Sequence, residues 1–282
     1  MVVMSNLQAD LPEKDLNVQA LAGESHESFV EHRFVFEAVP GERVPVAGSV
    51  PLPDDRRYPA IIFLYGIGME MDFPHEIAHA MTEAGFAIFV MEQYGRGERH
   101  VDRGAVLAEI ATLRKRLSLT ILETRRLVDV LQSRPDIDPE HIYLWGASFG
   151  AMTGAASMAY DQRIRAGVFT AAAGDLPRIA AGSPRLDDAD GIRWQRGIAR
   201  ILAEILRPFD PIRHVGSISP RPVLFQNAKQ DEIFPPETVK ALHDAAGQPK
   251  EIRWFESPHS RPPREIIEMV VEDGLSWLRE QM

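Results

Sequence analysis

The stretch HIYLWGASFG, residues 141–150, decides the fold that this chain adopts. It joins a short apolar run to the G-x-S-x-G pentapeptide of residues 146–150, and the small residues of a predicted helix follow. In such a strand–turn–helix context a serine lies on a strained turn, where glycine on both sides relieves contacts with the neighbouring strand and helix. The pattern predicts a nucleophile at Ser148. The simpler alternative is a helix that begins at a capping serine.

Short apolar runs alternate with helical stretches on both sides of this pentapeptide, which is typical of a parallel sheet covered on both faces. An antiparallel pair is predicted at residues 33–37 and 43–50, followed by strands at 60–65, 86–91, 141–145, 166–170, 222–226 and 251–255. Helices are predicted at about 74–84, 105–132, 149–160, 236–246 and 264–281. The sequence therefore predicts an α/β fold with a mostly parallel eight-stranded sheet and helices on both faces.

The domain organisation follows from where this rhythm begins and where it is interrupted. Residues 1–26 are polar and weakly periodic, and we expect a loosely packed N-terminal extension. Residues 27–282 form one predicted domain, because the chain has no repeats and no linker of the Gly/Ser type. Residues 174–209 contain no strand-like run, so they are predicted to be a small cap inserted into this domain.

Composition narrows the range of functions. The chain has 282 residues, no cysteine and a formal net charge of −10, which excludes disulfides and a cysteine nucleophile and offers no electrostatic footprint for nucleic acid or anionic lipid. The N-terminus lacks the pattern of a secretion signal, and no apolar run approaches a membrane span. We expect a cytoplasmic protein that acts on a small molecule, with no nucleic acid or membrane partner; a homodimer is left open.

A serine hydroxyl is a poor nucleophile unless an imidazole takes its proton and a carboxylate orients that imidazole. Asp231 follows the strand predicted at 222–226, and Glu232 beside it is the alternative acid. His259 follows the last predicted strand. Because functional residues of open α/β sheets gather at the carboxyl ends of strands, we predict that Ser148, Asp231 and His259 meet there.

The chain order Ser148, Asp231, His259 is the order found in α/β-hydrolases. From about residue 29 to 282 the sequence resembles this superfamily, and the nearest branches are dienelactone-hydrolase-like esterases and the catalytic domains of prolyl oligopeptidases. The resemblance implies the α/β-hydrolase fold and the roles of nucleophile, acid and base for those three residues. It also implies an oxyanion hole made by the backbone N–H groups of Ile67 and Phe149, and a structural role for Asp210.

Three further residues are candidates for the substrate pocket. Tyr65 precedes the oxyanion loop, although packing at a strand end explains it equally well. Arg96 lies in the loop of residues 92–98, EQYGRGE, which resembles the D-x-R-G-x-G loop of the superfamily. It could reach a substrate carboxylate, and a structural salt bridge is the simpler alternative. Trp194 of the predicted cap could line an acyl or alcohol pocket, or could merely pack the cap onto the core.

A competing motif occupies residues 75–79, HEIAH, which match the H-E-x-x-H signature of zinc metallopeptidases. On a helix, His75 and His79 would share a face with Glu76 as the base. Glu98 or Glu109 could then supply a third ligand. However, His75 would lie in the opening turn of a short helix that the first sheet crossover already explains. We therefore expect no metal and no cofactor.

These observations predict a serine hydrolase, in particular a carboxylesterase that cleaves small carboxylic esters through an acyl-enzyme intermediate. Peptidase, amidase and lactonase activities use the same chemistry and remain alternatives, and the zinc peptidase is a more distant one. A small cap, in place of the large propeller of prolyl oligopeptidases, favours esters over peptides.

Overall fold

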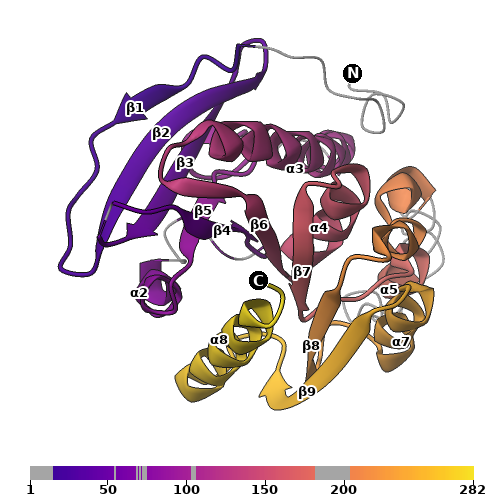
Figure 1. Ribbon diagram of the computed structural model, residues 1–282. Coiled ribbons are helices and arrows are strands. Elements are labelled where there is room, and N and C mark those ends of the chain that lie inside the picture. Colours follow the sequence, from indigo (N-terminus) through magenta and orange to yellow (C-terminus); the bar gives the residue numbers. More distant parts are fainter. Residues whose placement is uncertain are drawn as a thin grey trace.

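The computed structural model describes residues 15–53, 55–67, 69, 71, 75–102, 106–181 and 204–282, and its centre is a nine-stranded sheet (Figure 1). The strand order is β1-β2-β3-β5-β4-β6-β7-β8-β9. The first four strands in this order pair antiparallel, and all pairs from β5 to β9 are parallel. The strands are β1 Gln19–Leu21, β2 Phe29–Val39, β3 Glu42–Pro51, β4 Tyr58–Leu64, β5 Ala87–Met91, β6 Ile137–Ala147, β7 Ile164–Thr170, β8 Val223–Gln230 and β9 Lys250–Pro258.

Helices cover both faces of the sheet, with α3 and α4 on one side and α2 and α8 on the other (Figure 1). The helices are α2 His75–Glu83, α3 Val106–Ser133, α4 Phe149–Tyr160, α5 Leu176–Ala181, α7 Pro236–Ala245 and α8 Arg264–Arg279. The short 3-10 turns of the described residues are η1 Gly97–Arg99, η3 Arg207–Phe209, η4 Pro211–Arg213 and η5 Val215–Ile218. This arrangement confirms the predicted α/β-hydrolase fold.

Strands β4 and β5 are apolar along their whole length because both of their faces are buried. Successive side chains of a strand point to opposite faces, and β4 shows the result. Ile62 and Leu64 join the core formed with α3 and α4, whereas Ile61 and Phe63 join the core formed with α2 and α8. All four of these side chains are buried. The same double burial explains why these strands are recognisable in the sequence as short apolar runs.

Two strand registers bring distant parts of the chain together. β4 lies between β5 and β6, which is the point where the strand order reverses, and Leu64 is paired with Gly146. The loop after β4 therefore lies beside the turn after β6. Further along the sheet, Gln230 at the end of β8 is paired with Pro258 at the end of β9. The loops that follow these two strands consequently begin next to each other.

The N-terminal segment differs from the sequence prediction. In the described residues 15–26, β1 pairs antiparallel with β2 and Leu16 is buried, so this segment extends the sheet to nine strands instead of packing loosely. The three residues of β1 are all exposed. A strand that buries no side chain has no alternating pattern, and that is why the sequence did not reveal it.

The predicted cap is described only at its two ends. α5 and η3 lie within residues 174–209, and residues 182–203 lie outside the described residues. None of the described helices has the length and hydropathy that crossing a membrane requires.

The close crossing of α4 over β4 gives the first prediction. A Cβ added at Gly150 would lie 1.8 Å from the backbone oxygen of Leu64, whereas one added at Gly154 would lie 2.6 Å from Cδ2 of the Leu144 side chain. Backbone cannot yield as a side-chain tip can. We expect Gly150→Ala to lower the free energy of unfolding by at least about 2 kcal/mol, measured by urea denaturation.

Gly154→Ala is the matched control, since it places the same methyl group on the same helix. Its gain in helix propensity, about 1 kcal/mol, offsets the adjustment of Leu144. Equal unfolding midpoints for the two variants would contradict the close approach of α4 to β4.

Candidate active site

Ser148 lies on a strained turn between β6 and α4. Its backbone has φ 52° and ψ −111°, a conformation that residues other than glycine rarely adopt and that costs about 1–3 kcal/mol. The backbone N–H of Ser148 donates to the carbonyl of Thr170 in β7 at 2.9 Å, which ties the turn to the sheet. The side chain makes no capping hydrogen bond to the helix. The alternative of a simple capping serine is therefore wrong.

A chain of hydrogen bonds links the three residues that the sequence singled out. The hydroxyl Oγ of Ser148 lies 3.0 Å from Nε2 of His259, and Nδ1 of His259 lies 2.9 Å from Oδ2 of Asp231. A carboxylate only accepts, so Nδ1 carries the proton and Nε2 is left to accept from the serine. The side chains of His259 and Asp231 are 10% and 8% exposed, which shields the pair from bulk water.

Asp231 is itself held by its own loop. Its second oxygen, Oδ1, accepts the backbone N–H groups of Ile233 and Phe234, both at 2.8 Å. The Phe234 ring meets the imidazole of His259 edge to face, with centroids 4.8 Å apart. The loop after β8 thus fixes the acid and also packs against the ring that the acid orients.

Glu232, the alternative acid, has a different task. Its two carboxylate oxygens accept the backbone N–H groups of His259 at 2.9 Å and Ser260 at 2.8 Å. Burial by itself raises the pKa of Glu232, but hydrogen bonds from the Ser260 side chain and from these N–H groups outweigh it and lower the pKa to about 2. Asp231, and not Glu232, bonds the imidazole ring.

The expected oxyanion donors lie on the two loops that the β4–β6 register brings together. A Cβ on Gly66 would lie 3.4 Å from Cβ of Ser148, so the loop that carries Ile67 passes directly beside the serine. Phe149 is the first residue of α4, and the first N–H groups of a helix have no partner within it. Within the described chain, neither Ile67 nor Phe149 donates its backbone N–H to another residue.

Tyr65 does not line a pocket, contrary to the prediction. It is fully buried, and its hydroxyl donates to Glu92 at 2.7 Å while accepting the backbone N–H of Gln93 at 2.9 Å. Burial raises the pKa of Tyr65, which keeps the phenol neutral and able to donate. The Gln93 side chain donates back to the Tyr65 carbonyl at 3.0 Å. Tyr65 therefore anchors the start of the loop after β4, which carries Ile67.

A buried arginine completes this support. Nε of Arg116, on α3, donates to the side-chain oxygen of Gln93 at 2.9 Å, and its guanidinium lies 4.4 Å from the ring centre of Phe149. Burial lowers the pKa of Arg116 to about 10, which still leaves it charged at neutral pH. The network thus connects the loop after β4 with the residue that follows the nucleophile. Glutamine and arginine at these positions carried no recognisable motif.

Among the described residues, Arg96 makes no hydrogen bond to a carboxylate. Its Nη2 donates to the backbone carbonyl of Met69 at 3.0 Å, so it bridges its own loop to the oxyanion loop. The salt bridge considered as its simpler role is absent among the described residues, while contact with a substrate stays a prediction. Trp194, the third pocket candidate, lies outside the described residues.

Asp210 has the structural role that the resemblance implied. Its side chain is 2% exposed and accepts the backbone N–H groups of Asp175, Leu176 and Ile212. Burial raises the pKa of Asp210, and these three donors oppose that shift. Asp210 therefore ties the beginning of α5 to η4, the two points from which the predicted cap departs and to which it returns.

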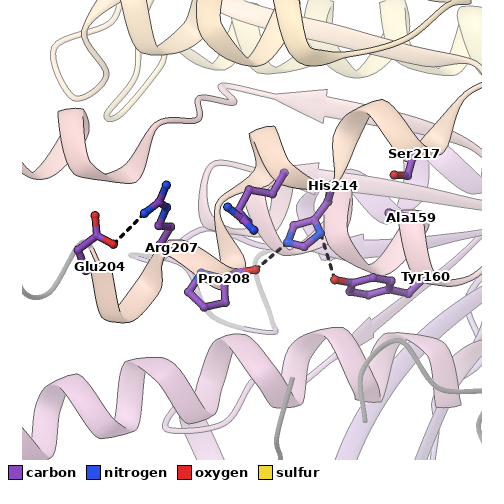
Figure 2. Close-up of a pocket in the computed structure, with 8 residues that line it drawn as sticks. Ala159, Tyr160, Glu204, Arg207, Pro208, His214 and Ser217 are labelled. Carbon is purple, nitrogen blue, oxygen red and sulfur yellow. Dashed lines mark hydrogen bonds and ion pairs between the residues drawn. The ribbon is translucent and has the colours of Figure 1, made fainter. Parts of the chain in front are cut away.

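A cavity of about 760 Å³ lies beside Tyr160, the last residue of α4, and thus at the opposite end of this helix from Ser148. Figure 2 shows side chains that line it. It is lined by residues that include Tyr160, Arg207 and His214. Both ring nitrogens of His214 are engaged, Nδ1 by the Tyr160 hydroxyl at 3.1 Å and Nε2 by the Pro208 carbonyl at 2.8 Å. Since α4 has 12 residues, its length of about 18 Å separates this cavity from the serine.

The zinc alternative gains no support from the described side chains. The ring of His79 is exposed, with Nε2 at 3.2 Å from Glu83 and Nδ1 at 3.3 Å from the Ser28 hydroxyl. The group of described residues that could share a metal ion is Glu24, His26 and Glu31, far along the chain from this motif. Among the described residues, Glu98 and Glu109 do not join His79 in such a group. The side chains of His75 and Glu76 lie outside those described.

The nine-stranded sheet, with a serine–histidine–aspartate chain at its strand ends, has the α/β-hydrolase fold. The Dienelactone hydrolase family model matches residues 46–181, a range that includes Ile67 and the whole G-x-S-x-G turn. The superfamily resemblance inferred from the motifs is thereby confirmed.

The chain is also similar to solved structures of the same fold and to a curated relative. Acetyl xylan esterase 1 from Thermoanaerobacterium sp. JW/SL YS485 is similar with a TM-score of 0.74 and 19% identity, over 97% of this chain and 92% of that chain. An acetyl xylan esterase from Paenibacillus sp. R4 has a TM-score of 0.73 and 19% identity, over 96% and 92%. The polyketide transferase ATR5 of Stachybotrys chlorohalonatus (strain IBT 40285) is 26% identical over 55% of this chain and 66% of its own.

The support beneath the oxyanion loop gives the second prediction. Tyr65→Phe removes the acceptor of the buried Gln93 N–H and one donor to Glu92, and an unsatisfied buried polar group costs about 1–3 kcal/mol. We expect thermal unfolding to show a loss of stability of this size.

Tyr58→Phe is the control. Among the described residues, the Tyr58 hydroxyl donates one hydrogen bond, at 2.7 Å, to the Pro53 carbonyl near the surface. We expect it to cost about 1 kcal/mol or less. If Tyr65→Phe proved no more damaging than Tyr58→Phe, the Tyr65 network would not be what holds the loop.

Proposed function

We propose that this protein is a serine carboxylesterase in which Ser148, His259 and Asp231 form the catalytic triad. The observation that carries the proposal is the continuous hydrogen-bond chain from the Ser148 hydroxyl through both nitrogens of His259 to the Asp231 carboxylate. The strained backbone of Ser148 supports it, because such strain persists in proteins mainly where function requires it.

The geometry supports a two-step acyl transfer. As Ser148 Oγ attacks the ester carbonyl carbon, its proton passes to Nε2 of His259, and Asp231 stabilises the imidazolium that forms. The backbone N–H groups of Ile67 and Phe149 stabilise the negative charge that develops on the carbonyl oxygen. His259 then protonates the leaving alcohol, and the acyl-enzyme remains.

Water completes the cycle. His259, neutral again, takes a proton from a water molecule that attacks the acyl-enzyme, and the carboxylate product leaves as Ser148 recovers its proton. None of these reaction steps requires a metal ion or an organic cofactor. The requirement is geometric. Oγ of Ser148 must face the carbonyl carbon while the two N–H donors face the oxygen of the same carbonyl group, and the β4–β6 register supports this arrangement.

Small esters are the substrate class we propose. Two proteins of similar fold act on acetylated xylan according to their names, and the matched family is named for a lactone substrate. Lactones and amides pass through the same tetrahedral intermediate, so they remain alternatives. The side chain of Ile67 cannot donate a hydrogen bond to the oxyanion, and for this reason we favour esters over peptides as substrates. The proposal includes a cytoplasmic location, which the absence of cysteine favours.

Covalent labelling tests the nucleophile directly. A fluorophosphonate should add once to the wild-type protein, seen as a single mass increment in the intact-mass spectrum, and should not add to Ser148→Ala. We expect kcat/KM for p-nitrophenyl acetate to fall by at least about 10³-fold in Ser148→Ala, because the triad acts as a unit.

His75→Ala serves as the control for the zinc alternative. We expect it to be labelled like the wild type, and we expect a chelator to leave ester hydrolysis unchanged. Labelling that survives in Ser148→Ala would remove Ser148 as the nucleophile. Activity that is lost with the chelator and insensitive to the fluorophosphonate would replace the esterase with a metal-dependent enzyme.

A further inference from the structure

We propose that Glu232 is a positioning residue that holds the backbone of the catalytic histidine, so that Asp231 and Glu232 together fix His259 from two sides. This inference rests on the proposed function, because it assigns Glu232 a part in the rate of acylation at Ser148.

The Glu232 carboxylate makes a bidentate contact with the loop after β9, which carries His259. One oxygen of Glu232 accepts the N–H of His259 at 2.9 Å, and the other accepts the N–H of Ser260 at 2.8 Å. Hydrogen bonds to an ionised carboxylate are shorter and stronger than those between neutral groups. Two such bonds from one side chain to consecutive residues restrain both the position and the tilt of the peptide that carries the imidazole.

The strand end explains why this restraint is needed. β9 is the edge strand of the sheet, so it has β8 as its one neighbour. The last residue pair between the two strands is Gln230 with Pro258, and His259 comes immediately after it. The backbone N–H of His259 therefore lies beyond the ladder, and the Glu232 carboxylate takes the place of the carbonyl that a longer β8 would have provided.

The residues beyond His259 give the loop little other support. Ser260 is exposed, and Arg261 has a left-handed backbone with φ 53°, an uncommon conformation for a residue other than glycine. A loop of this kind would be expected to sample several positions unless a side chain holds it. Glu232 supplies that hold from the neighbouring loop.

Asp231 and Glu232 divide the work. Asp231 bonds the ring nitrogen Nδ1, and its other oxygen is committed to the N–H groups of Ile233 and Phe234. Glu232 bonds the main chain of His259. An imidazole held only through its ring could still rotate or shift with its Cα, and a misplacement of about 1 Å can cost about 10²-fold in rate. The adjacent pair removes both freedoms.

The charge needed for this contact persists at working pH. The hydrogen bonds that lower the pKa of Glu232 to about 2 leave the carboxylate ionised throughout the range in which an esterase is assayed. A group with a lowered pKa loses its contacts only as the pH falls through that value. The restraint on His259 is thus constant and does not act as a pH switch.

Three variants separate reach, charge and hydrogen bonding. Glu232→Ala removes both acceptors. Glu232→Gln keeps the length and one acceptor oxygen, and Glu232→Asp keeps the charge with a side chain one methylene shorter. Glu256→Gln is the matched control, because Glu256 is an exposed carboxylate on β9 that accepts hydrogen bonds from the side chains of Lys229 and Gln230.

The measurements are kcat and KM for p-nitrophenyl acetate, the rate of fluorophosphonate labelling, and the thermal midpoint. In Glu232→Ala we expect kcat and the labelling rate to fall together by about 10–100-fold, with KM within about 2-fold of wild type. Glu232→Gln should retain more of the rate than Glu232→Ala, and Glu256→Gln should match the wild type in all measurements.

The outcomes distinguish the two levels of the proposal. Wild-type protein that fails to label at Ser148 would overturn the proposed function itself. If the wild type labels while Glu232→Ala keeps its full labelling rate, the function stands and the positioning role is wrong. A lowered thermal midpoint with an unchanged kcat in Glu232→Ala, or equal losses of kcat in Glu256→Gln and Glu232→Ala, would likewise assign Glu232 a role in stability or surface charge alone.

Discussion

The hydrogen bond between Ser148 and His259 depends on one backbone conformation. With φ at 52°, the chain turns sharply from β6 into α4 and leaves the hydroxyl outside the helix, 3.0 Å from Nε2. This turn can form only where strand and helix approach closely, and the contacts around it require glycine. A Cβ at Gly146 would lie 2.5 Å from the Gly150 oxygen, and one at Gly150 would strike the backbone of Leu64. The pentapeptide is therefore a steric requirement of the turn.

The rest of the site is assembled by pairs of strands. Leu64 opposite Gly146 places the loop after β4 beside the serine, and Gln230 opposite Pro258 places the acid loop beside the histidine loop. In both cases the strands are parallel, so their carboxyl ends lie at the same edge of the sheet. Residues that are 82 positions apart in the first pair and 28 in the second thereby become neighbours without any long-range motif of their own.

A second layer of polar residues supports this arrangement from within the protein. Below the oxyanion loop, the Tyr65 hydroxyl joins Glu92 to the backbone of Gln93, and Arg116 links Gln93 to the ring of Phe149. Buried polar groups are tolerable when they satisfy one another, and then they specify a single arrangement. On the histidine side, Glu232 does the same work at the surface. The loops that carry Ile67 and His259 are thus held by side chains outside the serine–histidine–aspartate chain.

The sequence by itself determined the α/β class, the strand and helix order from residue 29 onward, and the three candidate residues, Ser148, Asp231 and His259, that the structure brings together. These are readable because buried strands produce apolar runs and because a serine turn demands its glycines. It did not reveal β1, which buries no side chain, nor the inward position of Tyr65, nor the division of labour between Asp231 and Glu232. Those features were decided by the tertiary structure. The pairing of strands determines on which side a tyrosine is buried and which N–H groups a carboxylate meets. Strand pairing, in turn, is a property of the whole sheet.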